Sequence, residues 1–221
     1  KPSHASSDPE IAEDSQMAHI LVHEVGPRDG LQAEKQVVPT AIKLGWLERL
    51  IESGLDIVQV GSFVHPEKVP QMADTDELFR RLAASRRPGG AVLSGLVLNE
   101  KGLERGLACG VEMFCLGVSA SETHSRKNTG MGTAEATQRI VATALEAKRA
   151  GREVQVSVQS AFGCGFEGRV PEARVMEIVA AYLAAGLEAV SLADTAGHAH
   201  PAQVASYVRR ILAMAPGARI T

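Results

Sequence analysis

Residues 23–32 read His23-Glu24-Val25-Gly26-Pro27-Arg28-Asp29-Gly30-Leu31-Gln32 and follow a short apolar run at residues 19–22. The run predicts a buried strand, and Gly26 with Pro27 predicts a turn that ends it. Arg28 and Asp29 then lie at the carboxyl end of a strand, which is where parallel α/β proteins bind ligands. Buried charges there must pair with each other, a metal or a substrate. An ion pair in a surface turn is the alternative.

The composition indicates a globular chain with one sizeable core, since 45% of its 221 residues are hydrophobic and 22% are charged. The net charge of -3 gives no sign of a nucleic-acid or anionic-membrane partner. No apolar run approaches the roughly 20 residues that span a bilayer. The cysteines, Cys109, Cys115 and Cys164, are too scattered for a disulfide framework or a zinc ribbon. We therefore expect a cytoplasmic protein.

Two regions are expected along the chain. Residues 1–18 are rich in Ser, Asp, Glu, Pro and His without a hydrophobic period, which predicts a disordered N-terminal tail. Residues 19–221 alternate short apolar runs with stretches of helical spacing, which predicts a parallel sheet. The expected strands are residues 19–22, 55–60, 91–97, 111–118, 154–161 and 189–193. The expected helices are residues 40–53, 74–85, 100–109, 133–150, 171–185 and 201–214.

This alternation favours an incomplete TIM barrel of the (β/α)8 type. Six strand–helix units average roughly 33 residues, and eight would need about 260, near the usual size of such a barrel. An open doubly wound sheet is the alternative. It usually carries a Gly-rich dinucleotide fingerprint after its first strand, and the spacing of Gly26 here is wrong for one.

Polar residues recur at one end of nearly every predicted strand, whereas the helix faces show no such clustering. In a barrel this pattern predicts a site built from the loops that follow the strands. The candidates are Arg28, Asp29 and Gln32 after the first strand, Gln59 and Ser62 on the second, Arg126, Lys127 and Asn128 after the fourth, and Ser191 and Asp194 on the sixth.

Five ordered motifs together resemble the 3-hydroxy-3-methylglutaryl-CoA lyases of the DRE-TIM metallolyase group. The resemblance extends from about residue 19 to the end of the chain. The motifs are Glu24 to Gln32, Ser62-Phe63-Val64-His65-Pro66 with Val69 to Asp74, Arg126-Lys127-Asn128, Gly163-Cys164-Gly165-Phe166-Glu167-Gly168, and Ser191-Leu192-Ala193-Asp194-Thr195-Ala196-Gly197.

The resemblance implies an enzyme that splits an acyl-CoA substrate into acetyl-CoA and a β-keto acid such as acetoacetate, as in leucine degradation and ketone-body formation. A divalent cation, Mg²⁺ or Mn²⁺, is implied, with Asp29 as a metal ligand. A metal lowers the pKa of a hydroxyl that it binds. Arg28 is implied as the stabiliser of negative charge on the thioester oxygen. Gln32, Gln59, Ser62, Ser191 and Asp194 would line the site, and residues 126–128 would lie near CoA. A homodimer is also implied.

His198-Ala199-His200 has a spacing that places two rings on one face of a strand. Here it lies in the loop after the sixth strand, where that geometry does not hold, so we do not expect His198 and His200 to bind metal. The resembled family carries its His-x-His on strand seven, and this chain ends near the start of that strand. We expect these 221 residues to be C-terminally incomplete, inactive alone and weak in metal binding.

Gln59 departs from the resembled family, which usually has a glutamate in strand two. A neutral amide cannot act as a base or add negative charge to a metal shell. We expect Gln59 to slow the reaction or to shift preference toward a longer 3-hydroxy-3-alkylglutaryl-CoA. Two alternatives stay open: a degenerate, non-catalytic barrel that binds acyl-CoA, and an aldolase or Claisen-type synthase. The lyase-like stretch from Val64 to Asp74 argues against the synthase.

Overall fold

The computed structural model describes residues 20–84 and 90–221, so the predicted tail at residues 1–18 lies outside the described residues. Seven strands form one sheet in chain order, and every neighbouring pair is parallel. This confirms the predicted topology and excludes the doubly wound order. The strands are β1 (His23–Glu24), β2 (Ile57–Ser62), β3 (Val92–Leu96), β4 (Met113–Ser119), β5 (Glu153–Gln159), β6 (Ala189–Leu192) and β7 (Arg219–Ile220).

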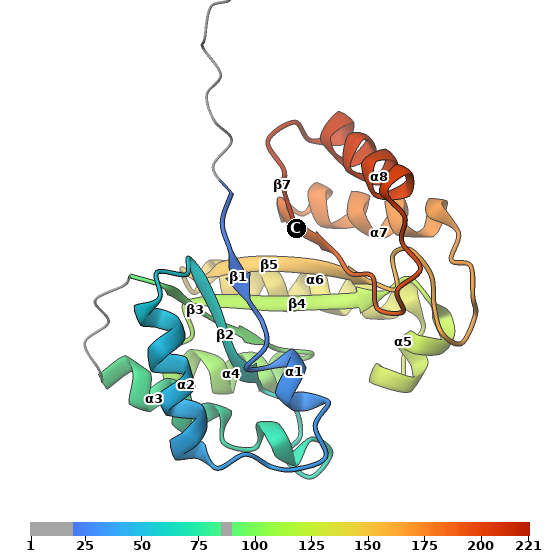
Figure 1. The fold of residues 1–221 in the computed structure, drawn as a ribbon. Helices are drawn as coiled ribbons and strands as arrows, with labels where there is room; N and C mark the ends of the chain where they lie inside the picture. Colours follow the sequence, from blue (N-terminus) through green and yellow to red (C-terminus); the bar gives the residue numbers. More distant parts are fainter. Residues whose placement is uncertain (1–19, 85–89) are drawn as a thin grey trace, which may run out of the picture.

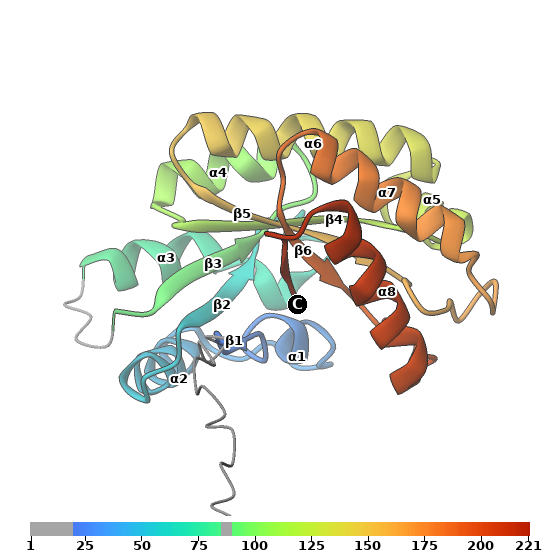
Figure 2. The same cartoon turned by 90° about the horizontal axis from the view of Figure 1, so that it is seen from above.

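The longer helices follow the strands and lie around the outside of the curved sheet (Figures 1 and 2). In the described ranges, no helix has both the length and the apolar character needed to cross a membrane. The helices are α1 (Asp29–Gln32), α2 (Thr40–Glu52), α3 (Thr75–Ala84), α4 (Glu100–Cys109), α5 (Glu122–Thr129), α6 (Thr133–Arg149), α7 (Glu172–Ala184) and α8 (Pro201–Met214), with a short 3₁₀ helix η1 (Pro70–Met72). Helices α1, α5 and η1 were not among those predicted from the sequence.

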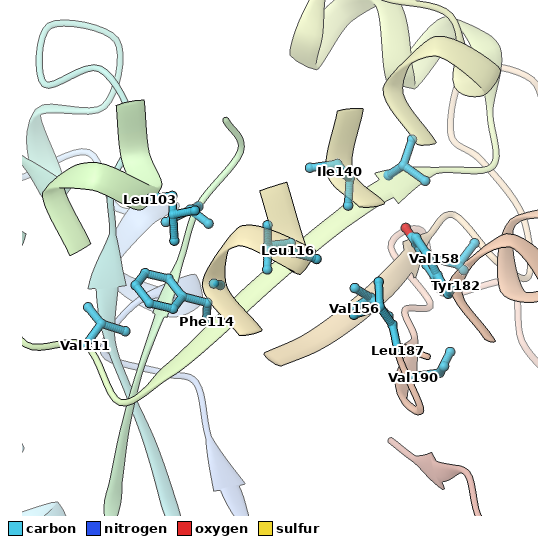
Figure 3. Close-up of a cluster of buried hydrophobic side chains, with 14 of the residues drawn as sticks. Leu103, Val111, Phe114, Leu116, Ile140, Val156, Val158, Tyr182, Leu187 and Val190 are labelled. Atoms are coloured by element: carbon cyan, nitrogen blue, oxygen red, sulfur yellow. The ribbon is translucent and has the colours of Figure 1, made fainter. Parts of the chain in front are cut away.

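The hydrophobic core lies between the outer face of the sheet and these helices. Alternate residues of β4 and β5 point outward, since successive side chains of a strand face opposite sides. Leu116, Val156 and Val158 are completely buried, and they pack with residues of α4, α6 and α7 (Figure 3). Tyr182 of α7 is also fully buried and donates its hydroxyl to the carbonyl of Ser157 at 3.0 Å. The core therefore fixes β4 and β5 and leaves their other face to the barrel interior.

The first strand differs from the prediction. Residues 20–22 were expected to form a buried strand, but Ile20, Leu21 and Val22 are 83%, 48% and 53% exposed, and β1 covers only His23–Glu24. The backbone N–H of Val22 donates to the side chain of Asp56 at 2.7 Å, and its carbonyl accepts the N–H of Ile57 of β2 at 3.1 Å, so only the last residue of the run meets the sheet. Apolar periodicity alone did not reveal that this run precedes the sheet.

An irregularity in β2 reverses which side its residues face. The pairing of β2 with β3 shifts between Gln59 and Gly61. Gly61 therefore faces α3, where an added Cβ would lie 2.5 Å from the hydroxyl of Thr75. Ser62 then points back to the concave side, and its hydroxyl donates to Gln32 at 3.2 Å. The bulge thus lets both Gln59 and Ser62 face the interior.

Candidate active site

The concave face of the sheet is polar where the convex face is apolar. β5 shows this most clearly, because Gln155, Ser157 and Gln159 alternate with the valines of the core. A cavity of about 710 Å³ lies against this face. Its lining residues are His23, Val25, Arg28, Asp29, Gln32, Ala33, Gln59, Leu96, Cys115, Leu116, Gln155, Ser157, Gln159, Ser191, Ala193, Asp194, Thr195 and Thr221. We call it the interior cavity.

The predicted turn brings Arg28 into the interior cavity. The carbonyl of Val25 accepts the backbone N–H groups of Arg28 and Asp29 at 3.0 and 2.7 Å. The N–H of Gly26 donates to the Glu24 side chain at 2.5 Å, so Glu24 secures the turn rather than the cavity. These bonds turn the chain directly after β1 and start α1 at Asp29.

Two neighbours hold the guanidinium of Arg28. Its Nε donates to Oε1 of Gln59 at 2.6 Å, and its Nη1 donates to Oδ1 of Asp29 at 2.5 Å. In the described part of the chain no hydrogen-bond partner meets Nη2. Burial lowers the pKa of Arg28, and the Asp29 charge acts in the opposite direction. Arg28 stays a cation, because a guanidinium keeps its proton in proteins. The Arg28 side chain is 18% exposed and that of Asp29 is 66% exposed.

The structure brings most of the predicted residues together. Arg28, Asp29, Gln32, Gln59, Ser191 and Asp194 all line the interior cavity. Ser62 is fully buried behind Gln32. Asp194 also secures its own loop, since its two carboxylate oxygens accept the backbone N–H groups of His198 and Ala199 at 2.8 and 3.0 Å.

A second cavity of about 510 Å³ adjoins the first, and the two share Arg28, Gln32, Leu96 and Gln159. We call it the basic cavity. Among the described residues that line it are five basic side chains and no carboxylate: Arg28, His65, Lys68, Lys127 and Arg139. Asn128 lines it too. Lys127 places its ammonium 3.6 Å from the centroid of the Phe166 ring.

Arg126 lies outside both cavities, unlike its two neighbours in the predicted basic group. It faces Glu122 on the same helix, 3.6 Å away, and its side chain is 67% exposed. An exposed pair of this kind contributes little to stability. Lys127 and Asn128 are therefore the members of the group that are placed to meet a ligand.

The two rings of the His-x-His pair contact different parts of the structure. The imidazole of His198 packs on the backbone of Gly163, where an added Cβ would lie 2.1 Å from Nδ1. Nδ1 of His200 accepts the backbone N–H of Gln203 at 3.4 Å and caps α8. Over residues 20–84 and 90–221 no three His, Cys, Asp or Glu side chains gather closely enough to hold a metal. Of the predicted ligands, Asp29 alone presents a carboxylate beside Arg28.

Several residues that reach the cavities were not predicted as site residues. In the interior cavity they include His23, Cys115, Gln155, Ser157 and Gln159. In the basic cavity they include His65, Lys68 and Arg139. The alternation Val154-Gln155-Val156-Ser157-Val158-Gln159 was the available signal for β5, since it marks one face of that strand as polar.

Comparison with known proteins supports the resemblance seen in the sequence. The hydroxymethylglutaryl-CoA lyase YngG of Bacillus subtilis is 35% identical over 201 residues, which make up 91% of this chain and 66% of that protein. The (R)-citramalyl-CoA lyase of Chloroflexus aurantiacus is 36% identical over 212 residues, or 93% of this chain and 67% of the relative. This chain thus spans about two thirds of the length of these relatives.

Solved structures give the same result. The crystal structure of the Bacillus subtilis HMG-CoA lyase matches with a TM-score of 0.85 and 35% identity, covering 91% of this chain and 66% of that one. An HMG-CoA lyase from Acinetobacter baumannii, in complex with coenzyme A and 3-methylmalate, matches with a TM-score of 0.83 and 33% identity, covering 90% and 64%. The HMGL-like family model matches residues 19–220. The chain therefore belongs to the HMGL-like family.

Proposed function

We propose that this chain forms the reaction site of a carbon–carbon lyase. The lyase cleaves a thioester like 3-hydroxy-3-methylglutaryl-CoA into acetyl-CoA and a β-keto acid such as acetoacetate. One observation carries the proposal: Arg28 lies where the interior cavity meets the basic cavity, with one guanidinium nitrogen unpaired by the described residues. An acyl group in the first cavity and CoA phosphates in the second would place the thioester beside Arg28.

The reaction needs charge stabilisation at that junction. The hydroxyl on C3 loses its proton, the C2–C3 bond breaks, and its electron pair moves onto the thioester as an enolate. Nη2 of Arg28 is free to donate to the enolate oxygen, an interaction that strengthens as the charge develops. The enolate carbon then takes a proton to become the methyl group of acetyl-CoA. Atoms balance without any oxidant or reductant.

A divalent cation, Mg²⁺ or Mn²⁺, belongs to this proposal. Mg²⁺ is usually held through one or two carboxylates, together with substrate oxygens and water. The exposed carboxylate of Asp29 fits that demand and lines the cavity. When bound there, the cation would lower the pKa of the substrate hydroxyl. His198 and His200 are engaged elsewhere and are not part of the proposed donor set.

The basic cavity suits the phosphates of CoA. Lys68 and His65 come from the loop after β2, and Lys127 and Asn128 come from α5. Arg139 is paired with Glu100 and Arg28 with Asp29. Lys68 and Lys127 are therefore the cations of the lining that favour an anionic ligand. The complex of a related HMG-CoA lyase with coenzyme A supports the same assignment. A homodimer and a cytoplasmic location stay predictions from the sequence.

The test is a substrate panel with the full-length protein and Mg²⁺. Hydroxymethylglutaryl-CoA, a longer 3-alkyl analogue and citramalyl-CoA are each supplied, and acetyl-CoA is measured against its keto-acid partner. We expect equal amounts of acetyl-CoA and keto acid from at least one of them. The degenerate barrel predicts saturable acyl-CoA binding without turnover of any substrate, and that outcome would replace the lyase proposal. Gln59 is the feature that favours this alternative.

A further inference from the structure

The loop after β5 carries an exposed aromatic side chain that the proposed reaction has not used. Phe166 is 57% exposed and lies outside the hydrophobic core. The N–H groups of Cys164 and Gly168 each donate to the carbonyl of the other at 2.7 Å, which closes the loop at residues 164–168. The N–H of Phe166 also donates to Sγ of Cys164 at 3.4 Å. The ring is therefore carried by a closed, hydrogen-bonded turn.

This turn is fastened to α5 through Glu167. One oxygen of its carboxylate accepts the N–H of Thr123, in the first turn of α5, at 2.6 Å. The first N–H groups of a helix have no partner within it, so the bond satisfies a donor that α5 leaves open. The other oxygen lies 3.7 Å from Nη1 of Arg174 in α7. Glu167 thus holds its neighbour Phe166 against α5.

Phe166 packs on one face of α5. Its ring lies 6.3 Å from the ring of His124, centroid to centroid, and the Lys127 ammonium lies 3.6 Å from its centroid. Residues three apart share a face of a helix, so one ring can meet both. A cation over an aromatic ring is attracted by the negative face of the ring. Because Lys127 also lines the basic cavity, the ring fixes where this ammonium stands at the cavity wall.

An aromatic ring holds a cation without cancelling its charge. Arg28 and Arg139, which line the same cavity, are each paired with a carboxylate, so part of their charge is already balanced. In the described part of the chain, Lys127 is held by the ring of Phe166 and by no carboxylate. The ring attracts the ammonium through its quadrupole and has no net charge. Lys127 therefore keeps its full charge for an anion.

We propose that Phe166 is a positioning residue: its ring holds the Lys127 ammonium, fully charged, at the wall of the basic cavity, where it meets a phosphate of CoA. The inference rests on the proposed function, which places these phosphates in that cavity. It gives a role to the motif at residues 163–168, which the proposed reaction leaves without one. Phe166 acts on substrate binding and not on the reacting atoms.

The test measures the binding of coenzyme A to the full-length protein by calorimetry, so that it needs no turnover. Phe166→Leu should weaken CoA binding about two- to fivefold, the range expected for a cation–π contact at an exposed site. Phe166→Tyr keeps the ring face and should rescue the affinity. Trp46→Leu is the matched control and should leave the affinity unchanged, since Trp46 is a 40% exposed aromatic residue of α2 that lines neither cavity.

Pantetheine is the second probe, because it lacks the phosphates of CoA. It should bind equally well to the original protein and to Phe166→Leu. An unchanged affinity of Phe166→Leu for CoA would overturn the inference. An equal loss of affinity for CoA and for pantetheine would also overturn it, since the ring would then act on another part of the ligand.

A double-mutant cycle tests whether Phe166 acts through Lys127. Lys127→Gln should weaken CoA binding, and Phe166→Leu should have no further effect once Lys127→Gln is present. Equal factors for Phe166→Leu in both backgrounds would show that the ring acts without Lys127, and the positioning role would be refuted.

Steady-state kinetics separates this inference from the lyase proposal. In Phe166→Leu, KM for the acyl-CoA substrate should rise and kcat should stay unchanged, because the ring does not meet the reacting atoms. A CoA affinity that depends on Phe166, without cleavage of any acyl-CoA, would refute the lyase proposal alone. Cleavage with a CoA affinity and a KM that are indifferent to Phe166 would refute the positioning role alone. Absence of CoA binding by the original protein would refute both.

Discussion

Replacing Arg28 with Gln should slow turnover far more than it weakens substrate binding. In the structure Nε is engaged by Gln59 and Nη1 by Asp29, so Nη2 is the nitrogen left to meet the thioester oxygen. Losing one such donor costs roughly 2.7–4 kcal/mol of transition-state stabilisation, or about 10²–10³-fold in kcat. Steady-state kinetics with the acyl-CoA substrate measures kcat and KM separately.

The control for this prediction is Arg126→Gln, which removes an arginine that lies outside both cavities and faces Glu122. It should leave kcat and KM unchanged. If Arg28→Gln changed KM alone and left kcat intact, Arg28 would bind the ground state, and the reasoning about developing charge would be refuted.

Three further predictions concern stability and metal binding. Lys43→Met should lower the free energy of unfolding by about 3–5 kcal/mol, because Lys43 is 3% exposed and its partner Asp74 would lose its cation. Urea unfolding measures this change, and a decrease below about 1 kcal/mol would contradict the prediction. The hydrogen bond from Arg139 lowers the pKa of Glu100 from its ordinary 4.5 to about 2. The stability that this pair adds should therefore be present above pH 4.5 and be lost as the pH falls toward 2. Thermal melts measure this pH dependence, and Glu100→Gln should remove it. Replacing His198 and His200 with Ala should leave Mg²⁺ affinity unchanged in calorimetry, and a clear loss would make the pair ligands.

The sequence predicted the order of the strands well because strand and helix periods differ strongly in this chain. Helix α4 shows the reason: it starts at the predicted residue, where the Asn99 side chain accepts the N–H of Gly102, and it stops at Gly110 in the left-handed region. Both signals are local. The start of β1 was wrong because pairing with β2, rather than the apolar character of residues 20–22, decides where the sheet begins.

Site residues that belong to a local sequence motif could be predicted from the sequence. Contacts that arise only from the packing of distant segments could not. Arg28, Asp29 and Asp194 line one cavity as expected. The hydrogen bond from Arg28 to Gln59 joins the turn after β1 to β2, and no sequence period reveals it. Lys68 likewise reaches the basic cavity only because the loop after β2 folds toward α5.

Cleavage in D₂O tests whether an enolate of acetyl-CoA forms at Arg28. The full-length protein is incubated with hydroxymethylglutaryl-CoA and Mg²⁺, and the acetyl-CoA formed is analysed by mass spectrometry. We expect acetyl-CoA with a single deuterium in its methyl group and an equal amount of acetoacetate. Free CoA without acetyl-CoA, or acetyl-CoA without deuterium, would contradict it.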